Sequence, residues 1–292
     1  MDRSDVGRRP KRERTYRRFL RRWALFLGGG YLLVCLVMWL IENWLVFYPT
    51  PAAKLWSELP VAAIRDVNFT SPTSPTSPGG TQIHAWWLPA TPDAPVILLC
   101  PGNAGNLSGR GETIVHMQER LGTSVLIFDY PGYGKSLGKP NESACYDAAE
   151  GALSWLRDEK GIGSERVILY GESLGGGVAT EMARRHPSRA LVLVKSFTSM
   201  PAVAKRHYAW LPCHWLMSNR FDNLSKLHEI HCPVFVLGAT ADQVVPFEHA
   251  ELLYKIANEP KQLFRDAGSD HNDPLPDAFW DELGDFLART TH

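Results

Sequence analysis

The chain has 292 residues, which suits one large α/β domain with an appendage and allows a sizeable core. Its formal net charge is zero, but residues 1–22 hold ten Lys or Arg and three Asp or Glu, so the remainder is mildly acidic. A body without a basic excess argues against nucleic-acid binding, because neutralising phosphates requires a basic face.

An uncharged apolar run from Trp23 to Ile41 follows this basic segment. As a helix, residues 23–41 are long enough to span about 30 Å of hydrocarbon, so they are predicted to form one transmembrane helix. Basic residues before the span and Glu42 after it place residues 1–22 in the cytoplasm and the body in the periplasm or another extracytoplasmic space. A cleaved signal peptide is the alternative, but the run exceeds the usual apolar region and no clear Ala-x-Ala site follows.

The five cysteines comprise Cys35 in the apolar run and four in the body. If the body is exported, one disulfide becomes possible, and Cys213 with Cys232 is the favoured pair. Spacing alone cannot establish that pairing. The Cys and His residues at 213, 214, 228, 231 and 232 do not follow the usual spacing of zinc ligands, so no metal is expected.

Two segments with strand-like alternation, residues 65–70 and 82–88, flank a threefold Thr-Ser-Pro repeat in residues 70–80. The repeat is too polar and proline-rich to form a core, so it is predicted to be an exposed loop joining a hairpin. From Pro95, apolar runs alternate with helical patterns, which indicates βαβ units and a mostly parallel sheet covered by helices on both faces. The predicted strands are 96–100, 124–128, 167–170, 190–194, 234–237 and 262–264, and the predicted helices are 112–121, 142–159, 174–185, 248–257 and 277–287.

Residues 196–230 interrupt this alternation. They are rich in Trp, His and Pro and lack a predicted strand, so we expect a small cap insert above the C-terminal edge of the sheet. Its aromatic residues could shape an apolar acyl pocket or could pack within the cap; they are Tyr208, Trp210, Trp215 and Phe221.

The segment 170–177, Tyr-Gly-Glu-Ser-Leu-Gly-Gly-Gly, lies between a predicted strand and a predicted helix. In a Gly-x-Ser-x-Gly turn of this kind the serine occupies a strained backbone position with its hydroxyl exposed, and small neighbours let the backbones approach. Ser173 is therefore the candidate nucleophile. The backbone N–H of Leu174, at the start of the helix, is placed to stabilise a developing negative charge.

A serine nucleophile needs a base, and the base needs an orienting carboxylate. Asp242 follows a predicted buried strand, and His271 follows the last predicted strand. Both lie at C-terminal ends of strands, where open α/β sheets place their sites, and they follow Ser173 in the order acid, then His. Asp270 and Asp222 are weaker rivals for the acid, because Asp270 is too close in sequence to face the His271 ring easily and Asp222 lies in the insert.

A second oxyanion donor is expected in the loop after strand 96–100. That loop, residues 101–106, reads Pro-Gly-Asn-Ala-Gly-Asn, and we favour the backbone N–H of Asn103 as the donor. A phosphate-binding glycine loop is disfavoured because no Gly-Lys-Ser/Thr ending is present.

With these motifs in order, the chain resembles the α/β-hydrolase superfamily, and within it the membrane-anchored serine hydrolases of the ABHD and Bem type, related to serine aminopeptidase-like domains. The resemblance covers residues 45–292 and implies an α/β-hydrolase fold with Ser173 as nucleophile, Asp242 as acid, His271 as base and no cofactor. The family usually has His where this chain has Pro101. The motifs that carry the resemblance are Phe47-Tyr48-Pro49-Thr50-Pro51, Gly102-Asn103-Ala104-Gly105-Asn106, Asp129-Tyr130-Pro131-Gly132-Tyr133-Gly134-Lys135-Ser136, Gly171-Glu172-Ser173-Leu174-Gly175, Asp242-Gln243-Val244-Val245-Pro246 and His271-Asn272-Asp273.

The resemblance implies hydrolysis of carboxylic ester or thioester bonds through an acyl-enzyme. The family includes depalmitoylating thioesterases, so acylated or lipid-like substrates near the membrane are expected. An aminopeptidase-type amide hydrolase is one alternative, and it would need an acidic pocket for a substrate amine. A non-enzymatic membrane scaffold is another, although no triad residue is lost here. The sequence leaves the natural substrate and the oligomeric state open.

Overall fold

The computed structural model describes residues 11–73 and 78–291 and divides the chain into two compact units, Met1–Glu42 and Asn43–His292. The described part of the first unit is dominated by α1 (Lys11–Leu40). Within α1, Tyr16–Leu40 is long and apolar enough to cross a membrane. The helix begins well before the predicted span, because the basic residues that precede the apolar run are also helical.

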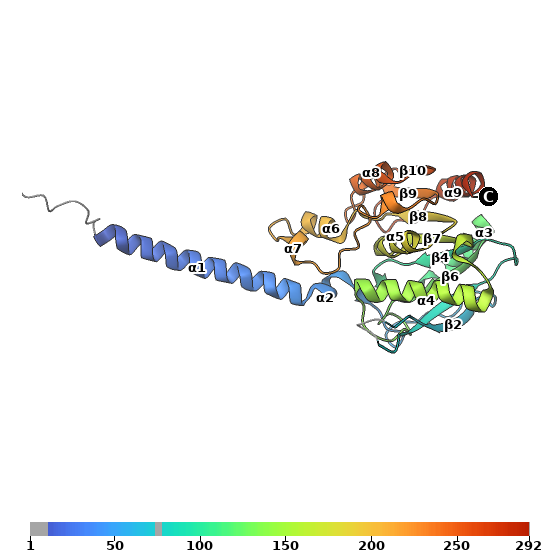
Figure 1. Ribbon diagram of the computed structural model, residues 1–292, viewed down its shortest axis with the longest axis horizontal. Coiled ribbons are helices and arrows are strands. Elements are labelled where there is room, and N and C mark those ends of the chain that lie inside the picture. Colours follow the sequence, from blue (N-terminus) through green and yellow to red (C-terminus); the bar gives the residue numbers. More distant parts are fainter. Residues whose placement is uncertain (1–10, 74–77, 292) are drawn as a thin grey trace, which may run out of the picture. The chain divides into compact units, whose positions relative to one another are not determined.

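The second unit is built on an eight-stranded sheet in the order β10-β9-β8-β7-β4-β6-β3-β2 (Figure 1). The strands from β10 to β6 in this order are parallel, while β3 pairs antiparallel with both β6 and β2. The mostly parallel sheet of an α/β-hydrolase fold is thus confirmed. The strands are β2 (Arg65–Thr70), β3 (Gln82–Leu88), β4 (Val96–Cys100), β6 (Ser124–Phe128), β7 (Val167–Glu172), β8 (Ala190–Val194), β9 (Val234–Ala239) and β10 (Lys261–Asp266).

Helices cover both faces of the sheet, as the sequence predicted. Residues of α4, α5 and α8 join one hydrophobic cluster, and residues of α3 and α9 join the cluster on the other face. Asn141 is the N-cap of α4, since its side-chain oxygen accepts a hydrogen bond from Ala144 N at 2.9 Å. The helices are α3 (Gly111–Leu121), α4 (Glu142–Lys160), α5 (Leu174–Arg185), α8 (Phe247–Ile256) and α9 (Asp277–Thr290).

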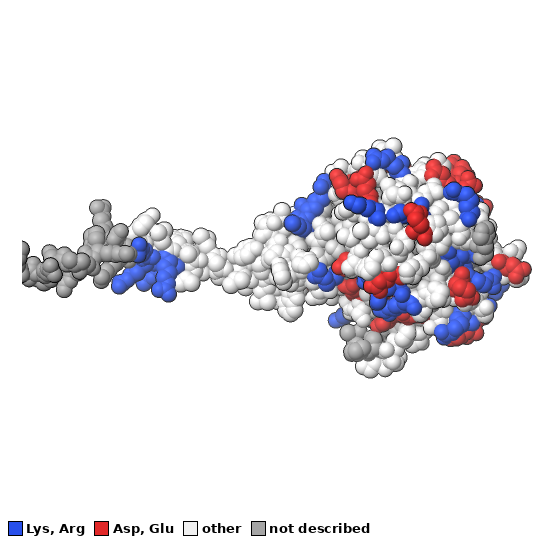
Figure 2. Space-filling view, turned by 45° about the horizontal axis from the view of Figure 1, so that its top comes forward, with Lys and Arg blue, Asp and Glu red and all other residues white. Residues whose placement is uncertain are grey.

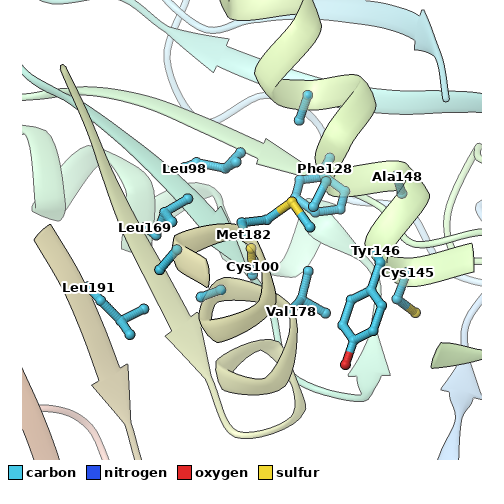
Figure 3. Packing of buried hydrophobic residues seen from close by; sticks show 14 of the residues in the cluster. Leu98, Cys100, Phe128, Cys145, Tyr146, Ala148, Leu169, Val178, Met182 and Leu191 are labelled. Carbon is cyan, nitrogen blue, oxygen red and sulfur yellow. The ribbon is translucent and has the colours of Figure 1, made fainter. Parts of the chain in front are cut away.

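The strands divide their side chains between the two clusters by simple alternation. In β4, Leu98 and Cys100 belong to one cluster, whereas Ile97 and Leu99 belong to the other, because successive residues of a strand point to opposite faces. Figure 3 shows Leu98 on the same side of the sheet as the apolar residues of α5. Burial on both faces explains why these strands read as continuous apolar runs.

Residues 196–230, all of which the structure describes, form no strand, as predicted. They form α6 (Met200–His207), α7 (Cys213–Leu216) and the 3-10 helix η3 (Leu227–Glu229). The hairpin predicted around the Thr-Ser-Pro repeat is confirmed by the pairing of β2 with β3, while residues 74–77 of the repeat lie outside the described residues.

The suggested disulfide between Cys213 and Cys232 is wrong, because both cysteines are free thiols in the structure. The Cys213 thiol instead lies 3.8 Å from the carbonyl oxygen of Tyr208, within its own insert. Burial raises the pKa of Cys232 to about 12, so this thiol is a poor nucleophile at neutral pH.

Charged side chains of both signs lie on the surface of the second unit (Figure 2). On the face shown in Figure 2, basic and acidic side chains are interspersed over the body. One partly buried ionic cluster surrounds Glu181 of α5. Its carboxylate contacts Arg184 and Arg185 of the same helix at 2.7 Å and Lys226 of the insert at 2.8 Å. This cluster ties α5, the helix that follows Ser173, to the insert.

Glu181→Gln is expected to destabilise the protein at pH 7 by about 3 kcal/mol, because it leaves the partly buried Lys226 without its carboxylate partner. Burial by itself raises the pKa of Glu181, but hydrogen bonds from Arg184 and Lys226 outweigh it and lower the pKa from 4.5 to about 2. A lowered folded-state pKa stabilises the fold above pH 4.5, and that stability is lost as the pH falls towards 2. The difference in the free energy of unfolding between the wild type and the variant should therefore shrink as the pH falls from 5 to 2.5.

Urea unfolding of the full chain in detergent at these pH values measures the effect. Asp158→Asn is the matched control, since Asp158 is exposed and pairs with its neighbour Arg157. A deficit that stays constant with pH would contradict the role assigned to the Glu181 carboxylate.

Candidate active site

Ser173 lies in the sharp turn between β7 and α5, with a backbone φ of 50°. This left-handed conformation is strained for a residue with a side chain. The turn is compressed on both sides. A Cβ at Gly171 would collide with the backbone of Gly176, and a Cβ at Gly175 would collide with the carbonyl oxygen of Cys100. Only glycine fits these two positions, so the turn has the architecture that the sequence predicted for a nucleophile elbow.

The structure brings Ser173, His271 and Asp242 together from three separate loops. His271 Nε2 lies 3.0 Å from Ser173 Oγ, and His271 Nδ1 lies 2.7 Å from Asp242 Oδ2. The serine follows β7, the aspartate follows β9 and the histidine follows β10, so all three loops leave the sheet at the carboxyl ends of parallel strands. The arrangement can pass a proton from the serine hydroxyl to the imidazole ring.

The Asp242 carboxylate is held in place by its own loop. Asp242 is buried, and its Oδ1 accepts hydrogen bonds from the backbone N–H groups of Val244 at 2.8 Å and Val245 at 2.7 Å. The other oxygen, Oδ2, is left to face His271. These bonds fix the carboxylate so that it can hold the imidazole ring in one orientation.

The two rival acids have different partners. Asp270 Oδ1 accepts the backbone N–H groups of Gln243 at 2.9 Å and His271 at 2.7 Å, and these hydrogen bonds lower the pKa of Asp270. Asp222 Oδ1 accepts the N–H of Ser225 within the insert at 3.2 Å. Asp270 therefore joins the loop of Asp242 to the loop of His271, which is a function that sequence spacing did not predict.

The loop that carries Asn103 lies against the nucleophile. A Cβ at Gly102 would lie 3.8 Å from Ser173 Cβ, and both Asn103 and Ser173 line the same cavity. The Asn103 carbonyl accepts hydrogen bonds from Tyr48 N at 3.0 Å and Tyr133 Oη at 2.8 Å. Within the described ranges we find no acceptor for the backbone N–H of Asn103 or of Leu174.

Pro101 occupies the position at which a histidine was expected. Its carbonyl oxygen accepts a hydrogen bond from Tyr130 Oη at 2.9 Å. That contact needs no donor on residue 101, so the missing N–H of proline does not disturb the bonds that hold the loop.

Three of the motifs quoted above form one bonded unit around this loop. The short strand β1 (Tyr48–Pro49) pairs with β5 (Ala104–Gly105). Asn106 Nδ2 donates to the carbonyl oxygens of Thr50 and Leu55, each at 2.9 Å. Asp129 Oδ1 accepts the N–H of Leu107 at 2.8 Å. The segments around residues 48, 104 and 129 thus buttress the candidate oxyanion loop.

A cavity of about 840 Å³ opens beside Ser173 and His271. One part of its lining is charged: Arg110 Nη1 contacts Glu172 Oε2 at 2.6 Å, and Glu112 and Glu119 of α3 also line it. Among the described residues, no group of three His, Cys, Asp or Glu side chains is placed to hold a metal ion.

The aromatic residues of the insert do not line this cavity. Phe221 is fully buried in the core, where its ring contacts those of Phe47 and Tyr146. Trp215 is 85% exposed. The suggestion that these aromatics shape the pocket beside Ser173 is therefore wrong, because none of them lines that cavity.

Lys195 is a residue of the site that the sequence reasoning missed. It follows β8 directly, it is buried, and its backbone φ of 49° is also left-handed. Its Nζ donates to the carbonyl oxygens of Asp270 at 3.0 Å and Asp273 at 2.8 Å, on either side of His271. The sequence did offer a signal for Lys195, because a charged residue directly follows an entirely apolar strand there.

Lys195→Met is expected to lower kcat by about 10-fold to 100-fold with little change in KM, because the loop that positions His271 loses two charged hydrogen bonds. Steady-state hydrolysis of a p-nitrophenyl ester measures both constants. Lys139→Met, at an exposed position, is the control. An unchanged kcat would show that the loop holds His271 without Lys195.

A family described as the alpha/beta hydrolase fold matches residues 95–215. The chain is 35% identical over 245 residues to the uncharacterized protein Rv2307c of Mycobacterium tuberculosis, covering 82% of this chain and 84% of that protein. It is 32% identical over 216 residues to alpha/beta hydrolase domain-containing protein 17B of Homo sapiens, covering 72% of each.

Solved structures share the architecture at low sequence identity. The esterase Pf2001 of Pyrococcus furiosus superposes with a TM-score of 0.67 at 19% identity, covering 85% of this chain and 99% of that one. The acetyl xylan esterase of Paenibacillus sp. R4 gives a TM-score of 0.64 at 17% identity, covering 80% and 86%. At these identities the likeness establishes a common fold.

Proposed function

The chain belongs to the α/β-hydrolase superfamily, and on that premise we propose that it is a membrane-anchored serine hydrolase that cleaves carboxylic ester or thioester bonds. The observation that carries the proposal is the continuous contact from Ser173 through His271 to Asp242, at 3.0 Å and 2.7 Å. Each member stands within hydrogen-bond reach of the next, as nucleophile, base and orienting acid require.

In the proposed mechanism, His271 Nε2 takes the proton of Ser173 Oγ as this oxygen attacks the carbonyl carbon of the substrate. Asp242 accepts the Nδ1–H of His271 and stabilises the imidazolium that forms. The ring then gives its proton to the departing alcohol or thiol, leaving an acyl-enzyme. Water, activated by the same ring, attacks the acyl carbon and releases the acid.

The backbone N–H groups of Leu174 and Asn103 would bind the oxyanion of the tetrahedral intermediate. Leu174 is the first residue of α5, so its N–H has no partner within the helix. Asn103 is held by Tyr48 and Tyr133 on its carbonyl side, which fixes the peptide loop beside Ser173. Donors fixed before the reaction need no reorganisation when charge develops.

The proposed anchor is the apolar part of α1. Its length and composition support a span, and the basic residues before it support an orientation with the N-terminus in the cytoplasm and the catalytic body outside. A body tethered in this way would meet acylated or lipid-like substrates at the membrane.

A second candidate activity is hydrolysis of amides that carry a free amine. Glu112 and Glu119 line the cavity beside Ser173, and a substrate ammonium group could pair with such carboxylates. The cavity therefore has the acidic character that the aminopeptidase alternative requires.

Ser173→Ala is expected to abolish covalent labelling of the purified full-length protein by a fluorophosphonate probe and to lower p-nitrophenyl ester hydrolysis by at least about 10³-fold, because the nucleophile is gone. Gel fluorescence and steady-state rates measure the two effects. Ser188→Ala is the matched control, since Ser188 lies in the turn after α5. Folded wild-type protein that does not label would exclude serine catalysis and support the scaffold alternative.

Rates on matched ester, thioester and anilide substrates distinguish the two candidate activities. If the enzyme is an esterase or thioesterase, acyl esters and thioesters should react faster than aminoacyl p-nitroanilides, and Glu112→Gln with Glu119→Gln should change ester rates by less than about threefold. An aminopeptidase would show the reverse preference. In that case the double variant would raise KM for the anilides, because the amine loses its ionic partners.

A further inference from the structure

The insert exposes cationic and aromatic side chains on one continuous stretch of sequence. Residues 199–221 contain three Lys or Arg, two His and no Asp or Glu. Lys205 and Arg206 of α6 are exposed, Trp210 is 58% exposed, and Trp215 of α7 is 85% exposed. We refer to Lys205, Arg206, Trp210, His214 and Trp215 as the insert face. Its composition differs from the mixed charge of the body.

The insert face has no place in the proposed reaction. None of its residues lines the cavity beside Ser173. Exposure of large indole rings to water is unfavourable, and exposed aromatic patches of this kind mark surfaces that bind a partner. Trp side chains are enriched at the headgroup level of bilayers, and neighbouring Lys and Arg side chains are attracted to anionic lipids.

One end of the insert is bonded to the residues that directly follow the proposed span in the sequence. Asn219 Nδ2 of the insert donates to Asn43 Oδ1 at 2.8 Å, and the ring of Phe221 packs on that of Phe47. Only Ile41 and Glu42 separate Asn43 from Leu40, the last residue of α1. Three peptide units reach at most about 11 Å, so the covalent chain alone limits how far Asn43 can lie from the end of the span.

Glu142 of α4 fixes the same end of the insert. Its carboxylate accepts the backbone N–H groups of Arg220 and Phe221, and it also bonds to Tyr146. The root of the insert is fixed as well, because Ser196 Oγ donates to the carbonyl oxygen of Ser173 at 3.0 Å. The insert is thus a braced element that connects the nucleophile turn to the residues that follow the span.

We propose that the insert face docks on the surface of an anionic phospholipid bilayer, with Trp210 and Trp215 at the level of the headgroups and Lys205 and Arg206 against lipid phosphates. The proposal rests on the membrane anchoring proposed above. Cations close to an anionic lipid surface are attracted to it electrostatically. Docking would hold the body in one orientation on the membrane instead of leaving it to rotate on its tether.

The test uses the full chain inserted in vesicles of phosphatidylcholine and phosphatidylglycerol that contain a doxyl-labelled lipid quencher. Bimane is attached to Trp215→Cys on the insert face and, in a second protein, to Ala288→Cys, an exposed position on α9. In Figure 1, α7 and α9 lie at opposite ends of the body. Wild-type protein, whose cysteines in the second unit are buried or half-buried, gives the labelling blank.

Lipid quenching at position 215 well above that at position 288 is the expected result. Adding Lys205→Glu and Arg206→Glu should lower the docked-to-undocked ratio by at least about tenfold, whereas the matched reversal Lys139→Glu with Lys160→Glu should leave it unchanged. Fluorophosphonate labelling should persist in all variants and shows that they are folded.

Three results would overturn the inference in distinguishable ways. Equal, weak quenching at both positions in protein that resists carbonate extraction would mean that the anchor holds but the insert face is free. Cross-linking of Trp215→Cys between two chains, without lipid quenching, would assign the face to a second copy of the protein. Extraction of the wild-type chain by carbonate would remove the anchor itself, while leaving serine hydrolysis to be judged by the labelling of Ser173.

Discussion

The left-handed backbone of Ser173 is the constraint on which the rest of the site depends. This conformation presents the hydroxyl to His271, and it persists only because the surrounding backbones leave no alternative. Gly175 abuts the carbonyl of Cys100, and Ser173 N is bonded to the carbonyl oxygen of Val194 at 2.9 Å. Contacts with the neighbouring strands β4 and β8 therefore keep the backbone of Ser173 in its strained conformation. A side chain at Gly175 would push α5 away from β4 and displace the nucleophile together with the first N–H of the helix.

A second set of contacts determines where the substrate oxygen can bind. The loop of Asn103 carries no strand long enough to be rigid by itself, and it is braced by segments from elsewhere in the chain. Tyr48 and Tyr133 bond to its carbonyl, and Asp129 bonds to the residue that follows the loop motif. The apolar residues just before Tyr48 belong to the main core. The segment that leaves the proposed membrane span is therefore also a structural part of the active site.

The insert and the cavity of the second unit differ in the kinds of side chain that they present. The cavity beside Ser173 has an ionic wall, with Arg110 paired to Glu172 and further carboxylates on α3. Trp210 and Trp215 of the insert are exposed instead, and residues 199–221 hold cations and no acidic residue. A polar cavity and an aromatic, basic outer face are compatible with the proposed hydrolysis, at a lipid surface, of bonds between acyl groups and polar partners.

The order of apolar runs and helical patterns predicted the sheet, its helices and the turn at Ser173, because parallel strands buried on both faces leave an unmistakable run of apolar residues. Local motifs likewise favoured Asp242 over Asp270 and Asp222 as the acid, and they proposed His271 as the base. Tertiary structure alone decided the rest. Lys195 reaches the His271 loop, and Asp270 joins two loops, through contacts between residues far apart in sequence. The placement of the insert depends on Glu142 and Asn43, which bond to it from outside its own sequence, so no local pattern of aromatic residues could predict that they would not line the cavity.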